Sequence, residues 1–170
     1  MIFLGILLKK PSNPEEYITN AGYGGVFLMG VIGSASPLWP LPGSWAAFFA
    51  VGLAGLNPLL VGFIVGLGEA IGELSGYTAG FGGQIAVQRW KRYTQIESWM
   101  KRHGGATIFT ASAIPNFFIK MATIAAGSLR YPLWRFFIFC WMGKIVKSLG
   151  FAYAGYWFFD QIKGLVERTF

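Results

Sequence analysis

The stretch that decides the fold is WAAFFAVGLAGL, residues Trp45 to Leu56, which is apolar throughout yet only about a dozen residues long. A helix that crosses a bilayer needs roughly 20 predominantly apolar residues. This stretch cannot be extended, because the proline-rich run Ser36 to Gly43 precedes it and Asn57-Pro58 follows it. The pattern therefore predicts a re-entrant hairpin over about residues 36–57, which enters the membrane and returns to the same face.

A second interrupted stretch lies in the other half of the chain. Residues Ala106 to Leu129 are long enough to cross a bilayer, but Pro115-Asn116 splits them and Lys120 interrupts their second part. We predict a second hairpin over about residues 106–130. Broken backbone at membrane depth is tolerated only where protein or a water-filled cavity satisfies its polar groups. Two such hairpins therefore predict an enclosed polar site of the kind that transporters use.

The composition is that of an integral membrane protein, because 54% of the residues are hydrophobic and only 12% are charged. We expect an all-α, multi-pass fold with one transmembrane domain over residues 21–160. An N-terminal interfacial segment (1–20) would precede it and a tail (161–170) would follow. Residues 21–35 are expected to form a first, short transmembrane helix, and residues 59–81 and 133–159 two longer crossings.

The only long polar stretch, residues 84–105, carries most of the clustered basic residues. The positive-inside rule makes this stretch cytoplasmic, and its spaced apolar residues predict a helix that lies on the membrane surface. The N-terminus is then expected inside and the tail outside, and the two hairpins would enter from opposite faces. The remaining basic residues are dispersed along apolar segments, so the net charge of +7 is expected to attract anionic lipid headgroups and not nucleic acid.

A faint internal repeat supports the inverted arrangement of the hairpins. Each half has a proline, an apolar run, an Ala-Gly pair and a second proline that opens a long helix: first Pro42, Ala54-Gly55 and Pro58, then Pro115, Ala126-Gly127 and Pro132. The first long helix carries Glu69 and Glu73, and the second carries Lys144 and Lys147 at nearly the same distances from its proline.

These four charges are predicted to face one another inside the helix bundle. A charge at the centre of a transmembrane helix costs about 2.5–3.5 kcal/mol, so four of them need partners or water. We expect Glu73 and Lys147 to act as a coupled pair, and the alternative is an ion pair that only orients two helices. Lys120 either lines the same cavity opposite Glu73 or extends to the cytoplasmic face, as is expected of Arg130 and Arg135.

Glycines recur every four residues beside the glutamates, at Gly68, Gly72, Gly76 and Gly80, and predict close approach of neighbouring helices. The sequence contains no Ser/His/Asp arrangement, metal-ligand set or phosphate-cradling glycine loop, and Cys140 is the only cysteine. We therefore expect no enzyme, no cofactor and no metal site.

The second hairpin and the helix after it contain the motifs Ala111 to Asn116, Gly127, Pro132-Leu133-Trp134, Phe136-Phe137 and Gly143 to Lys147. These motifs resemble the DedA superfamily, also called SNARE-associated Golgi or VTT-domain proteins, and in the second hairpin its vacuole membrane protein branch. Pro40 to Gly43 and Gly72 to Gly80 look like the family's first hairpin tip and its Gly-acid, Tyr, Gly motif. The resemblance covers roughly residues 24–155. It implies opposed re-entrant hairpins that scramble or flip phospholipids or polyprenyl-phosphate carriers, with proton coupling in some members.

Four positions depart from the family pattern. Ser44 stands where bacterial members usually have an acid, and Phe81 replaces a common arginine. Phe117 and Lys120 occupy positions that are often Pro and Asp in the vacuole membrane protein branch. Glu69 and Glu73 are then the only acids in the membrane that could couple to protons.

The predicted function is a scramblase or flippase that lets a lipid headgroup slide through a polar groove while the acyl tails stay in the bilayer. The substrate pathway is expected to comprise Glu69, Glu73, Tyr77, Pro115, Asn116, Lys120, Lys144 and Lys147, with Arg130 and Arg135 contacting headgroups at the cytoplasmic face. A secondary transporter of a small ion or solute with a closed midplane site is the alternative, and a non-transporting scaffold is a third. An open lateral groove would favour lipid, and a sealed cavity would favour a solute.

The expected partners are membrane lipids with anionic headgroups, and a homo-oligomer is left open. The expected location is an integral, multi-pass position, in the cell membrane if the source is prokaryotic.

Overall fold

The computed structural model describes residues 14–35, 43–82, 93–114 and 118–169, which are nearly all helical and include no strand. The helices are α2 (Pro14–Ala35), α3 (Gly43–Ala54), α4 (Pro58–Phe81), α5 (Tyr93–Ala113), α6 (Phe118–Ser128) and α7 (Leu133–Thr169). The all-α prediction is confirmed for this part of the chain. Most of the first hairpin tip, and the predicted site residues Pro115 and Asn116, lie outside the described residues.

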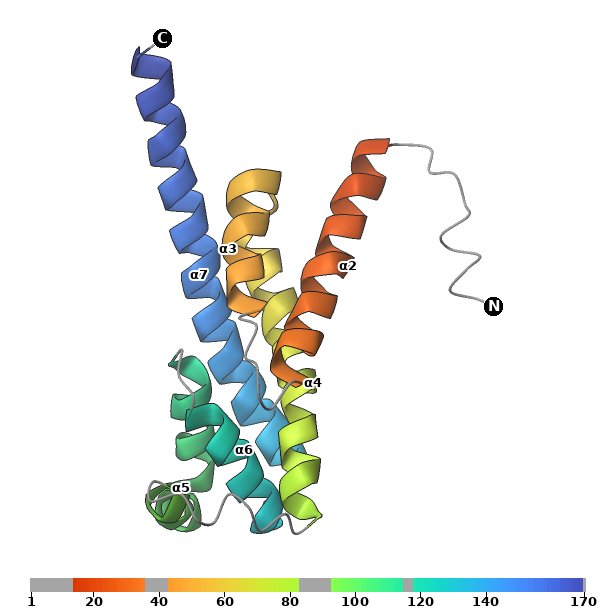
Figure 1. Ribbon diagram of the computed structural model, residues 1–170, viewed down its shortest axis with the longest axis vertical. Coiled ribbons are helices and arrows are strands. Elements are labelled where there is room, and N and C mark those ends of the chain that lie inside the picture. The colour runs from red at the N-terminus through yellow and green to blue at the C-terminus, as the bar shows by residue number, and fades with distance from the viewer. Residues whose placement is uncertain (1–13, 36–42, 83–92, 115–117, 170) are drawn as a thin grey trace, which may run out of the picture.

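The two long helices, α4 and α7, pack against each other in opposite directions (Figure 1). Both are long and apolar enough to cross a membrane, as expected. Glycines bring them together, because a Cβ on Gly66 would lie 3.0 Å from the Cα of Ile145. Helix α7 continues through Gly150 and Gly155 to Thr169. Its length of 37 residues corresponds to about 55 Å, which is more than a bilayer core requires.

Helix α2 ends at mid-height of the molecule, and α3 runs back toward the end at which α2 began (Figure 1). The carbonyl of Ala35, the last residue of α2, accepts a hydrogen bond from Ser75 Oγ of α4 at 2.9 Å. Helices α2 and α3 therefore form a helical pair. Its first arm is α2, which contains the residues 21–35 that were expected to cross the membrane. Its second arm is α3, the only helix that the structure describes within residues 36–57, which were expected to form the whole hairpin. The start of α2 lies at the end of the molecule opposite α5 (Figure 1).

Helices α5 and α6 form the second pair, at the other end of the molecule (Figure 1). Helix α5 bends at His103, whose φ of −140° and ψ of 53° are not helical. Helix α6 ends in a Schellman turn, in which Tyr131 N donates to Ala126 O at 2.9 Å and Arg130 N donates to Gly127 O at 3.0 Å. Arg130 takes the left-handed conformation of that turn, with φ of 51°. The pair covers the range expected for the second hairpin.

The part of α5 before the bend packs one face against the bundle and leaves another face on the outside. Ile96 and Met100 are buried in the core, whereas Trp99 is exposed. Residues 84–92 of the predicted surface helix all lie outside the described part of the chain.

The glycine stripe of α4 packs against two different helices, which confirms the prediction of close approach. A Cβ on Gly68 or Gly72 would lie 2.4 Å from a carbonyl oxygen of α2. A Cβ on Gly80 would lie 2.1 Å from a carbonyl oxygen of α6. Since the glycines face α2 and α6, the glutamates one position further along α4 turn toward α7.

The two Ala-Gly pairs of the repeat have different roles. Gly55 ends α3 in the left-handed conformation, with φ of 65°, a geometry that glycine adopts without strain. Gly127 lies inside α6, where a Cβ would come within 2.0 Å of the Tyr77 carbonyl oxygen. The position that corresponds to Gly55 in the turn after α6 is Arg130.

Two apolar cores lie toward the two ends of the bundle. One core joins α2, α3, α4 and α7 around Val26, Val51 and Val65. The other joins α4, α5, α6 and α7 around Ile108 and Phe136. Charged residues of α4 and α7 lie between these cores, whereas many large apolar side chains are exposed on the outside, among them Leu28, Leu53, Leu60, Met142, Val146 and Trp157. An apolar exterior around a charged interior is typical of a membrane protein.

Candidate functional site

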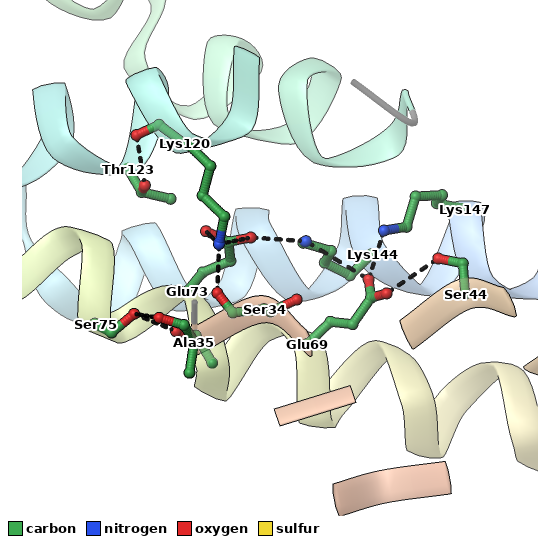
Figure 2. Close-up of polar contacts among 11 residues, drawn as sticks. Ser34, Ala35, Ser44, Glu69, Glu73, Ser75, Lys120, Thr123, Lys144 and Lys147 are labelled. Carbon is green, nitrogen blue, oxygen red and sulfur yellow. Dashed lines mark hydrogen bonds and ion pairs between the residues drawn. The ribbon is translucent and has the colours of Figure 1, made fainter. Parts of the chain in front are cut away.

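A cluster of charged side chains occupies the centre of the bundle (Figure 2). Glu69 and Glu73 are one helical turn apart on α4, and each is 1% exposed. Lys144 and Lys147 project from the facing side of α7 and Lys120 from α6, close to the start of that helix. The helix packing described above therefore brings five ionisable groups from three helices into one buried layer.

The five groups form a chain of alternating charge. Lys144 Nζ lies 2.9 Å from Glu73 Oε1 and 3.5 Å from Glu69 Oε2, so it bridges the two carboxylates. Lys147 Nζ lies 2.6 Å from Glu69 Oε2, at one end of the chain. Lys120 Nζ lies 3.1 Å from Glu73 Oε1, at the other end.

Two groups from the first helical pair complete the cluster. The Ser44 hydroxyl of α3 donates to Glu69 Oε1 at 3.0 Å. Lys120 Nζ also donates to the main-chain carbonyl of Ser34 in α2. The cluster thus joins α2, α3, α4, α6 and α7, and both helical pairs meet at it.

With all five groups ionised, the cluster contains one more positive charge than negative, because three lysines face two glutamates among the described residues. The undescribed segments 36–42 and 115–117 contain no ionisable side chain that could balance it. Burying an uncompensated charge is costly. The arrangement can therefore accept one monoanionic group, and it disfavours a cation.

The structure corrects one predicted pairing and decides one alternative. Lys147 pairs with Glu69 and not with Glu73, whose partners are Lys120 and Lys144. Figure 2 shows Lys144 beside Glu73 and Lys147 beside Glu69, so the register of the two long helices, and not residue spacing, sets these partners. Lys120 pairs with Glu73 inside the bundle and does not extend to the surface, because its side chain is only 10% exposed.

The other predicted site residues that the structure describes, Tyr77, Arg130 and Arg135, take no part in the ion pairs of the charge cluster. The Tyr77 hydroxyl donates to the Tyr131 carbonyl at 2.6 Å and so connects α4 to the turn before α7. Arg130 and Arg135 are exposed, and their guanidinium groups lie over the rings of Phe81 and Trp134, at 5.5 Å and 5.1 Å. Sequence reasoning did not find the contacts of Ser44 and of the Ser34 carbonyl. A main-chain acceptor leaves no signal in a sequence.

An open groove of about 710 Å³ runs along α5 and α6 on the outside of the bundle. Its lining includes Trp99 in the first part of α5, Thr107 and Thr110 beyond the bend, and Phe118 at the start of α6. The groove therefore extends from the part of α5 before the bend to the first turns of α6. Its lining is mainly apolar, with Gln95 and the two threonines as the polar groups.

Comparison with known proteins supports the resemblance seen in the sequence. Residues 41–157 match the VTT domain. The chain is also 29% identical over 103 residues to Vacuole membrane protein KMS2 of Arabidopsis thaliana, a match that covers 49% of this chain and 25% of that protein. The chain therefore spans well under two thirds of that relative. No solved structure matches the chain. Because the VTT match includes all five charged groups, the whole of α4, and α7 as far as residue 157, the chain belongs to the VTT-domain family of membrane proteins, also known as the DedA or SNARE-associated family.

Proposed function

We propose that this protein lets lipids with phosphate-bearing headgroups cross the bilayer, as a scramblase or flippase of phospholipids or polyprenyl phosphates. The buried cluster with one excess lysine is the observation that carries the proposal. A phosphodiester carries one negative charge and would neutralise that excess. Charge-assisted contacts from ammonium groups to phosphate are among the stronger polar interactions. A cationic solute would be repelled at the same position, which argues against a cation transporter.

Lys147 and Lys120, at the two ends of the cluster, can each leave a glutamate and bind a phosphate with the smallest loss of ion pairs. If Lys147 leaves Glu69, that carboxylate keeps Lys144 at 3.5 Å and the Ser44 hydroxyl at 3.0 Å. If Lys120 leaves Glu73, that carboxylate keeps Lys144 at 2.9 Å. Lys144 would therefore hold both glutamates while Lys147 and Lys120 bind the headgroup in turn.

The groove along α5 and α6 brings a lipid to the first turn of α6, which also contains Lys120. Phe118 lines the groove, and Lys120, two positions later, projects from the other side of the helix toward Glu73. An open groove with apolar walls lets the acyl tails remain in the bilayer while the headgroup follows the polar residues. A closed site for a soluble molecule would not need this opening.

In this proposal, the pairs α2–α3 and α5–α6 are re-entrant hairpins that enter from opposite faces. Helix α4 follows the pair α2–α3 in the chain and packs on the first arm of that pair, α2, and on the second arm of the other pair, α6. Helix α7 follows the pair α5–α6 and likewise packs on α5 and on α3. Such a relation is expected of inverted repeats. Lys101, Arg102, Arg130 and Arg135 lie in the helices and the turn at the α5 end, which would make that end cytoplasmic.

Transport itself is tested by reconstituting the full chain in vesicles that contain a fluorescent phospholipid, with protein-free vesicles as the control. We expect dithionite to bleach the inner-leaflet fluorophore only when the protein is present. A pH gradient should leave the rate unchanged for a scramblase and change it for a proton-coupled flippase. Bleaching limited to the outer leaflet under all conditions would refute the proposal.

The topology is tested by cysteine labelling in a Cys140→Ala background, because Cys140 is the only native cysteine. Asn20→Cys and Asn57→Cys are expected to react with an impermeant maleimide from outside, and Lys101→Cys and Ser128→Cys from the cytoplasm. Each pair has one residue in the first arm of a hairpin and one at the end of its second arm, so its two members should label from the same side. Labelling of either pair from opposite sides would exclude the re-entrant arrangement.

The groove is tested by filling it without changing charge. Thr110→Trp is expected to slow lipid movement severalfold, because Thr110 is exposed in the groove and an indole would occupy the space needed by the headgroup. The matched control is Leu53→Trp, at a residue of α3 that is 71% exposed and not part of the groove lining. Equal rates for the two variants in the vesicle assay would show that the groove is not the route.

A further inference from the structure

We propose that a second pocket, at the bend of α5, is a binding site for an anionic phospholipid. The pocket has a volume of about 510 Å³. It is lined by residues 103–106 at the bend of α5, by Tyr131, and by Trp134, Arg135, Ile138 and Phe139 in the first turns of α7. None of these residues belongs to the buried charge cluster, and only Ala106 also lines the groove. The inference does not depend on lipids crossing the membrane.

The bend of α5 lies directly against aromatic rings and so forms one wall of this pocket. The helix breaks at His103, and two glycines follow the break. A Cβ on Gly104 would lie 2.6 Å from the Tyr131 ring, and a Cβ on Gly105 would lie 2.6 Å from the Phe139 ring. Only glycine allows this approach, which leaves a concave surface between the bend and the first turns of α7.

Arg135 supplies the positive charge of the pocket. Its guanidinium lies 5.1 Å from the centre of the Trp134 ring, an arrangement that holds a cation in place without neutralising it. The described residues that line the pocket include no acidic side chain. Basic pockets between transmembrane helices on the cytoplasmic side typically bind anionic lipid headgroups.

The apolar part of the lining favours a lipid over a free phosphate ion. Trp134 is 62% exposed and Ile138 is 42% exposed, one helical turn apart on α7. An acyl chain lying along these residues would cover them while the phosphate contacts Arg135. Tyr131 and Trp134 are also the residue types that concentrate at the membrane interface. A soluble anion would leave these apolar side chains uncovered.

The site is tested by photo-crosslinking the full chain in phosphatidylcholine vesicles that contain phosphatidylglycerol with a diazirine-bearing acyl chain. We expect crosslinks in the peptides that contain residues 103–106 and 134–139, and about fivefold fewer when diazirine-bearing phosphatidylcholine replaces the anionic probe. Arg135→Gln is expected to reduce the phosphatidylglycerol crosslinks by a similar factor, whereas Arg135→Lys should retain most of them.

The matched control is Lys101→Gln, which removes one positive charge at the same end of the molecule but outside the pocket lining. Folding of each variant is checked by size-exclusion chromatography, and Arg135 is exposed, so its substitution should not disturb the core. Equal losses in the two glutamine variants would indicate diffuse electrostatic attraction and overturn the proposal. Equal crosslinking of the two lipids by the native protein would also overturn it. Loss of transport with intact crosslinking would refute only the proposed function.

Discussion

Replacing Glu73 with glutamine is expected to destabilise the folded protein by about 3–5 kcal/mol, the usual cost of removing one partner from a buried ion pair. Glu73 is 1% exposed and pairs with both Lys120 and Lys144. Its loss leaves three buried lysines facing Glu69 alone. The measurement is the unfolding free energy, or the midpoint of thermal unfolding, in detergent micelles.

The charge count of the cluster provides the controls for this prediction. Lys144→Met removes an equally buried partner but leaves two neutral pairs, Lys120 with Glu73 and Lys147 with Glu69, so its cost should be clearly smaller. Combining Glu73→Gln with Lys120→Met restores the native excess of one positive charge and should recover much of the lost stability. Equal destabilisation by Glu73→Gln and Lys144→Met would show that the excess charge does not govern stability.

Replacing Lys147 with methionine is expected to slow lipid movement by about 10- to 100-fold while the protein remains folded. This range corresponds to the loss of about 1.5–3 kcal/mol from one hydrogen bond to a charged group. Folding should survive, because Glu69 keeps Lys144 and the Ser44 hydroxyl as partners. The rate is measured with the fluorescent-lipid vesicle assay, and the folded fraction by size-exclusion chromatography.

Two variants separate a role on the pathway from a structural one. Lys101→Met removes the same charge from a side chain that is 62% exposed on α5 and should leave the rate unchanged. Lys147→Arg keeps the positive charge and should retain a large part of the activity. If Lys147→Met moves lipid at the native rate, Lys147 is not on the pathway. Lys120 would then be the remaining lysine at an end of the cluster that could leave its glutamate and bind the headgroup.

Parts of the site could be predicted from local features of the chain. Glu69 and Glu73 are four residues apart, so they share a helix face in any α-helix, and intramembrane charges need opposite charges because an apolar medium does not solvate them. The same reasoning identified Lys144 and Lys147 as partners. The four-residue spacing of the glycines predicted close helix packing, because residues four apart lie on one face of any α-helix and small residues there let another helix approach.

The pairing within the cluster and the arms of the first hairpin required the tertiary structure. Whether Lys147 meets Glu69 or Glu73 depends on how far α7 is shifted along α4, and neither helix encodes that shift by itself. The shift is set by contacts such as that of Gly66 with Ile145, between residues far apart in the chain. Likewise, the length of α2 is compatible with a crossing, but only its packing beside α4 shows that it stops at mid-height.

An all-helical membrane protein with two long helices and a set of buried opposite charges could be predicted from the residues alone, because helical period and hydrophobic length act within one segment. That the set contains three lysines for two glutamates followed from the packing of the helices. Lys120 joins it through the packing of α6 on α4, and Ser34 contributes only a main-chain carbonyl. The physical reason is that a charge balance inside a bundle is a property of contacts between segments, and the positions of single residues do not specify those contacts.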